Sequence, residues 1–220
     1  MQMIPPRLLL KVEHYCPSVQ GSLEGKFPNL GEKGVIDNLA SLNPVTSVGG
    51  KNFGLLKTGW TPEGLFFHLE VSGKTKDPEG ALDKPLQSDG LTLLIDTHYS
   101  RSSHRATAFC HMFHFLAAGG GHDGTEAFFF QGQFRRAMDN APPAPAGSVA
   151  FRSRRFRGGY EIEGFLSAEA LHGYDPQSNR ELGFFYRLLD RELGEQTLLP
   201  GVEDVPLDDP TLWETLKLAD

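Results

Sequence analysis

The chain has 220 residues and a net charge of −7, from 21 Lys+Arg against 28 Asp+Glu. Its hydrophobic content of 39% and charged content of 22% are ordinary for a globular protein and exclude a disordered chain. No run approaches the ~18–20 apolar residues of a membrane-spanning helix, and the acidic balance argues against a basic phosphate-binding surface, so we expect no membrane or nucleic-acid partner.

Glycine and proline punctuate the chain, with 25 and 15 copies. This frequency favours many short strands and disfavours a helical bundle. Five prolines interrupt residues 1–50, where only a short extended piece such as Leu8–Val12 is expected. We therefore predict an irregular N-terminal arm over 1–50, packed on a β-sandwich domain over 51–220.

The strand signals become clear from Gly59 onwards. Leu65, Phe67, Leu69 and Val71 alternate with other residues at the period of two that marks a strand. Two later segments are apolar on both faces, which is typical of central strands. The predicted strands are Leu65–Val71, Leu91–Ile95, Phe109–Leu116, Ala127–Gln131, Val149–Ser153, Tyr160–Leu166, Phe184–Asp190 and Leu216–Leu218.

One short helix is predicted, over Ala168–His172. Ser167 is a suitable N-cap, and Glu169 would lie in the first turn. With this single exception the pattern is all-β. The predicted fold class is an antiparallel β-sandwich of the immunoglobulin or jelly-roll type, with one short helix near 168–172.

Five motifs occur in an order that resembles the family 9 carbohydrate-binding modules and their DOMON-like relatives. Together they extend over roughly residues 55–219, which is most of the chain. They are GWTPEGLFFHLEV (59–71), SDGLTLLIDT (88–97), GGYEIEGFLSAEAL (158–171), LGFFYRLLDRE (182–192) and DDPTLWETLKL (208–218).

The resemblance implies a β-sandwich, a saccharide as ligand and, by analogy with some members, bound calcium. In sugar-binding members two tryptophans clamp the sugar, but here Leu86 and Leu207 stand near those two places. Thr92 replaces the glutamate of the family's strand motif. A flexible leucine does not reproduce aromatic stacking, so we do not expect strong binding to the ends of cellulose or xylan.

Our first functional hypothesis is a non-catalytic module that binds a saccharide or another small polar ligand at one loop rim. The rim would combine the loops around Asp89, His98–Arg105 and Arg187–Gln196. The last of these segments is equally well explained as an internal arginine–carboxylate network. The candidate ligand-binding residues are Asp89, His98, His104, Arg105, His111, Arg187, Asp190 and Glu192.

A second hypothesis is a metal-dependent enzyme that uses a histidine cluster. Five of the eight histidines lie between His98 and His122, with Asp96 and Cys110 nearby. None sits at a recognised ligand spacing, so the simpler interpretation is that these histidines are polar side chains on a strand and its loops, with no metal-binding role. No established catalytic motif occurs in the chain, and Cys110 lies in an apolar run typical of a buried, inert thiol.

A third hypothesis is a ligand-free interaction module, including a homodimer paired through its aromatic strands. We interpret Trp60 and Trp213 as core residues and the arginines of 152–157 as protection of an edge strand. The start of the sequence contains no secretion signal, so a cytoplasmic location is expected as written. A trimmed N-terminus would imply an extracellular one.

Overall fold

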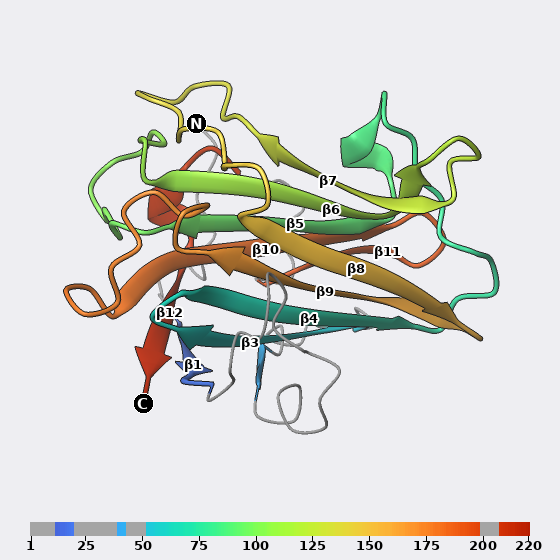
Figure 1. Cartoon of the computed structure of the whole chain (residues 1–220), viewed down its shortest axis with the longest axis horizontal. Coiled ribbons are helices and arrows are strands. Elements are labelled where there is room, and N and C mark those ends of the chain that lie inside the picture. Colours follow the sequence, from blue (N-terminus) through green and yellow to red (C-terminus); the bar gives the residue numbers. More distant parts are fainter. Residues whose placement is uncertain (1–11, 20–38, 43–51, 199–206) are drawn as a thin grey trace, which may run out of the picture.

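The structure, a computed structural model, describes residues 12–19, 39–42, 52–198 and 207–220, and consists of two packed β-sheets (Figure 1). The seven-stranded sheet has the order β1-β12-β10-β5-β6-β7, with β11 also paired to β10. Its strands are β1 (Glu13–Pro17), β5 (Gly90–Asp96), β6 (Cys110–Gly120), β7 (Glu126–Gly132), β10 (Glu181–Asp190), β11 (Gly194–Thr197) and β12 (Glu214–Ala219).

The five-stranded sheet has the order β2-β3-β4-β9-β8. Its strands are β2 (Ala40–Leu42), β3 (Gly54–Thr61), β4 (Gly64–Ser72), β8 (Val149–Phe156) and β9 (Gly159–Ser167). Two 3₁₀ turns, η3 (Pro85–Gln87) and η4 (Pro210–Leu212), are the only helical elements in the described ranges. No helix there has the length and apolarity that crossing a membrane requires.

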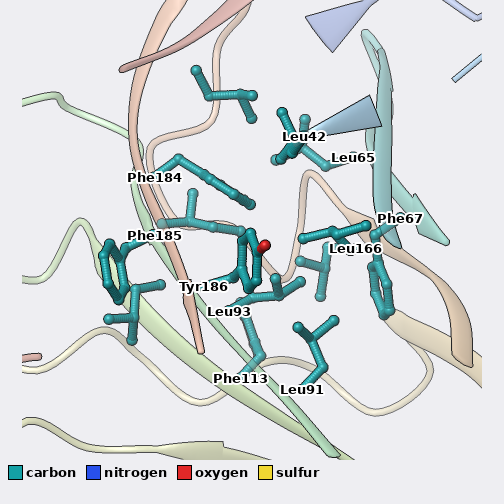
Figure 2. Packing of buried hydrophobic residues seen from close by; sticks show 14 of the residues in the cluster. Leu42, Leu65, Phe67, Leu91, Leu93, Phe113, Leu166, Phe184, Phe185 and Tyr186 are labelled. Atoms are coloured by element: carbon teal, nitrogen blue, oxygen red, sulfur yellow. The ribbon is translucent and has the colours of Figure 1, made fainter. Parts of the chain in front are cut away.

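The core lies between the two sheets and follows from the alternation of side chains along each strand. Phe184 and Tyr186 of β10 point toward β4, where Phe67 faces them (Figure 2). Each of these aromatic side chains is at most 2% exposed. Full burial of a large apolar side chain contributes about 1.5–3 kcal/mol, so each residue of this layer stabilises the sandwich substantially. All eight strands predicted from the sequence are present.

The expected sandwich is confirmed, with one departure from antiparallel pairing. β1 runs parallel to β12, and the next residue, Ser18, forms a parallel bridge to Trp60 of β3. This crossing joins the two sheets along one side. Trp60 is 4% exposed, donates Nε1–H to Ala219 O at 2.8 Å and lies under the Arg180 guanidinium at 4.5 Å.

The second tryptophan is also a core residue. Trp213 is 1% exposed, and its ring lies 5.8 Å from that of Phe134. Leu207 packs against the same core, whereas Leu86 in η3 is 51% exposed. The structural interpretation of both tryptophans is therefore confirmed.

The predicted helix over Ala168–His172 is wrong. The segment is a series of tight turns in which Ala170 N–H donates to Ser167 O and Leu171 N–H donates to Ala168 O. Ser167 does not cap it, because its hydroxyl has no hydrogen-bond partner. Five residues are too few to offset the cost of helix nucleation. The turn conformation is stabilised instead by Leu171, whose side chain is fully buried.

The N-terminal residues contribute to both sheets. β1 extends the seven-stranded sheet and β2 pairs with β3 in the other, so the described parts of the expected irregular arm form strands. The expected extended piece at Leu8–Val12 lies outside the described residues apart from Val12. The boundary at residue 50 stays a prediction.

Candidate functional site

A buried lysine, Lys74, lies where β5 begins and β10 ends. Its Nζ is 2.6 Å from Asp190 Oδ2, 3.0 Å from Asp89 Oδ2 and 3.8 Å from Glu192 Oε2. Burial opposes the charged ammonium, but the hydrogen bonds that it donates to Asp190 and Asp89 outweigh this effect and raise the pKa of Lys74. We call these four residues the Lys74 cluster.

The carboxylates of the Lys74 cluster are also bound by backbone N–H groups. Asp89 accepts from Arg191 N at 2.7 Å and from Glu79 N at 3.0 Å. Asp190 Oδ1 accepts from Glu192 N and Leu193 N, both at 3.0 Å. These bonds tie the loop after β4 to the ends of β5 and β10, so the cluster holds this rim together.

Glu192 is the exposed member of the cluster. It accepts from both N–H and Oγ1–H of Thr75 and from Lys76 N, and these hydrogen bonds lower the pKa of Glu192 to about 2. A polar cavity of about 220 Å³ lies beside it. The cavity is lined by Lys74, Lys76, Asp77, Glu79, Asp89, Arg191 and Glu192.

These residues do not fit the calcium that the family resemblance implied. Calcium takes six to eight oxygen ligands, but the Asp89, Asp190 and Glu192 carboxylates converge on an ammonium group. The position between them is taken by Lys74 Nζ. Across the described ranges, no group of three or more His, Cys, Asp or Glu side chains could hold a metal ion.

A row of four residues crosses the outer face of the seven-stranded sheet, the face turned away from the five-stranded sheet. The strand registers place Arg187 of β10 beside Thr92 of β5, Thr92 beside His114 of β6, and His114 beside Phe130 of β7. Thr92 Oγ1 and His114 Nδ1 are 2.9 Å apart, and the His114 and Phe130 rings stack at 4.4 Å. The row is continuous from hydrogen-bonding groups to an aromatic ring.

A second phenylalanine extends this row. Phe128 lies two residues before Phe130 on β7, and their rings are 6.1 Å apart with an angle of 26° between planes. Both rings are half-buried. We call Phe128 and Phe130, with His114, Thr92 and Arg187, the outer-face site.

The charge state of the outer-face site follows from its burial. Burial and the nearby Arg187 charge lower the pKa of His114 to about 4, so its imidazole is neutral near pH 7. Arg187 donates Nη1–H to Leu86 O at 3.2 Å and Nη2–H to Glu195 Oε2 at 2.7 Å. The imidazole of His114 is therefore neutral and only 3% exposed, and the polar group that the site presents to solvent is the Arg187 guanidinium, which is balanced by one carboxylate.

The histidines between 98 and 122 do not assemble into one site. His98 lies edge-on to Phe109 at 4.7 Å, and His111 lies on the core face of β6 with Nε2 3.2 Å from His172 O. Burial lowers the pKa of His111 to about 4. His114 lies on the opposite face of the same strand, so the metal-dependent alternative gains no support.

Two other candidates, His104 and Arg105, bind neighbouring segments of the chain. His104 Nδ1 is 3.0 Å from Asp209 Oδ2, and Arg105 donates Nε–H to Arg136 O at 2.8 Å. Cys110 is buried, which raises the pKa of its thiol to about 11. The contacts of His104 and Arg105 therefore connect loops of the chain, and neither these residues nor Cys110 form a recognisable ligand site.

The structure thus brings three of the predicted site residues together, Asp89, Asp190 and Glu192, around a lysine that the sequence did not single out. Arg187–Gln196 forms the internal network that the sequence allowed, with ion pairs from Arg187 to Glu195 and from Arg191 to Glu79. Sequence reasoning did not select Thr92, His114, Phe128 or Phe130 as ligand residues. The alternation within 127–131 was the available signal, because it puts two phenylalanines on the face opposite Phe129.

The two-sheet architecture is a β-sandwich, and comparison with solved structures shows that the chain has the fold of family 9 carbohydrate-binding modules. A family 9 module from Caldicellulosiruptor kristjanssonii in complex with cellotriose is similar over 94% of both chains, with 13% identity and a TM-score of 0.61. The same module with glucose shows 12% identity over 94% of this chain and 95% of its own. A Bacteroides uniformis protein matches 95% of this chain and all of its own length, with 12% identity and a TM-score of 0.61. No family model and no curated protein matches the sequence.

Proposed function

We propose that the chain is a non-catalytic carbohydrate-binding module whose saccharide lies on the outer-face site. One observation carries the location: two half-buried phenylalanines, Phe128 and Phe130, lie side by side next to hydrogen-bonding groups. A solved structure with the same fold holds cellotriose, which supports a saccharide as the ligand class.

The chemistry of the outer-face site suits a pyranose ring. A pyranose has an apolar face of C–H groups, which packs against aromatic rings, and an equatorial rim of hydroxyl groups. Arg187 has five N–H donors, and its contacts with Leu86 and Glu195 leave donors for ligand oxygens. Phe128 and Phe130 would supply the contact area, and Arg187 would set the orientation of the sugar.

The loop rim predicted from the sequence is the competing location. Its acidic members Asp89, Asp190 and Glu192 already accept hydrogen bonds from Lys74 or from backbone groups. Freeing a buried carboxylate from such partners costs more than a sugar hydroxyl returns. These contacts favour the outer-face site over the rim.

A glycan array followed by calorimetry on soluble saccharides tests the proposal. The expected result is millimolar or tighter binding that falls at least tenfold in Phe130→Ala, because removing a large apolar side chain from the contact costs about 1.5–3 kcal/mol. Phe156→Ala is the matched control, since Phe156 is 37% exposed on β8 of the other sheet. Absence of binding to any saccharide would reject the function, while equal loss in both variants would reject the location.

A further inference from the structure

β7 is a sheet edge whose ladder with β6 is regular from Phe128 to Gly132 and shifts register only between Leu116 and Gly120 of β6. It ends the seven-stranded sheet, and in the described structure its backbone makes hydrogen bonds only in its ladder with β6. Its sequence, EAFFFQG, has one charge at its first residue and no proline or basic residue. Unpaired edges of this composition are templates for pairing with another strand.

The other sheet edges are protected. β8 carries Arg152, Arg154 and Arg155, and the edge strands β2 and β11 are only three and four residues long. β1 ends in Pro17 and continues into the bridge between Ser18 and Trp60. Charges, proline, short length and cover by another segment are the devices that block edge-to-edge association. Among the described edges, β7 alone combines a length of seven residues with no proline and no charge beyond its first residue.

The charges that flank β7 are complementary under antiparallel self-pairing. Glu126 begins the strand, and Arg135 and Arg136 follow its end. All three are exposed, and none forms an ion pair in the described structure. Antiparallel pairing centred on Phe129 puts the acidic end of each strand near the basic end of the other.

We infer that β7 pairs antiparallel with β7 of a second copy of this chain, joining two seven-stranded sheets into one. A two-fold axis at Phe129 places Phe128 of one copy beside Phe130 of the other on the outer face, where cross-strand aromatic pairs are favourable. Each copy uses its one unprotected edge, so the assembly closes at a dimer.

The pairing would also join the two pairs of phenylalanines into one aromatic surface. The outer face of β7 remains uncovered, because edge pairing uses backbone groups that lie in the plane of the sheet. If saccharide binds to this face, as proposed above, the joined surface would accept a longer ligand, and this expectation rests on the proposed function. The dimer does not, since it depends only on the edge and its charges.

Sedimentation of the full chain from micromolar to millimolar concentration tests the inference. We expect a reversible monomer–dimer equilibrium that Glu126→Arg weakens by about tenfold, because the two-fold axis makes each charge reversal act twice. The double variant Glu126→Arg/Arg135→Glu should restore association, which separates a charge effect from misfolding. A monomer at all concentrations, or a dimer that Glu126→Arg leaves unchanged, would overturn the inferred β7 pairing. Calorimetry with saccharide tests the proposed function independently of the dimer.

Discussion

The Lys74 ammonium lies 2.6 Å from the Asp190 carboxylate, and these side chains are 2% and 0% exposed. Removing one partner of a buried ion pair leaves an uncompensated charge, which typically costs about 3–5 kcal/mol. We therefore expect Lys74→Met to lower the free energy of unfolding by about that amount. Urea denaturation of both proteins measures it.

Lys76→Met is the control for the Lys74 substitution, because Lys76 lies two residues away on the surface and its side chain forms no ion pair in the described structure. Surface substitutions of this kind change stability by less than about 0.5 kcal/mol. If Lys74→Met proved as mild as its control, the Lys74 cluster would not hold the rim together.

Acid pH is expected to destabilise the fold through two buried histidines. His111 and His114 have folded-state pKa values of about 4, below the ~6.5 of an unfolded histidine. The folded state therefore favours their neutral form. Their contribution is complete above pH ~6.5 and is lost as the pH falls toward 4, at up to about 1.4 kcal/mol per pH unit for each group.

The substitution His114→Gln isolates one of these histidines. Stability curves between pH 7 and 4.5 should become less steep in this variant, and His122→Gln, at an exposed loop position, is the matched control. Parallel curves for the parent and His114→Gln would show that His114 does not resist protonation in the folded state.

Trp60 is expected to matter for stability and not for saccharide binding. Trp60→Phe removes the hydrogen bond to Ala219 O and part of the contact with Arg180. Loss of one buried hydrogen bond with imperfect repacking costs about 1–3 kcal/mol. Thermal unfolding should show this loss, while calorimetry with the best saccharide gives an unaltered Kd; a weakened Kd would place Trp60 in the binding site.

The alternation of apolar residues was enough to predict the sandwich, because side-chain direction along a strand is a local property. Leu65–Val71 and Phe184–Asp190 both lie in strands as predicted. β3 was missed as a separate strand and Ala168–His172 was misassigned. In the second case the burial of Leu171, a tertiary contact, decided the conformation.

The site depended on strand register, which the sequence does not display. Arg187, Thr92 and His114 are adjacent only because β10, β5 and β6 are neighbours in the order of the sheet. Lys74 was missed for the same reason, since its partner Asp190 is 116 positions away in the chain. Clusters of similar residues, such as the histidines of 98–122, were misleading because adjacent strand positions face opposite sides.

The outer-face location of the saccharide is the central claim, and an NMR titration of backbone amides tests it most directly. The ligand is the saccharide with the strongest signal on the glycan array. We expect saturable shifts at Thr92, His114, Phe128 and Phe130, with little change around Lys74. Shifts confined to Lys74, Asp89 and Glu192 would instead place the ligand at the loop rim and reject the outer-face location.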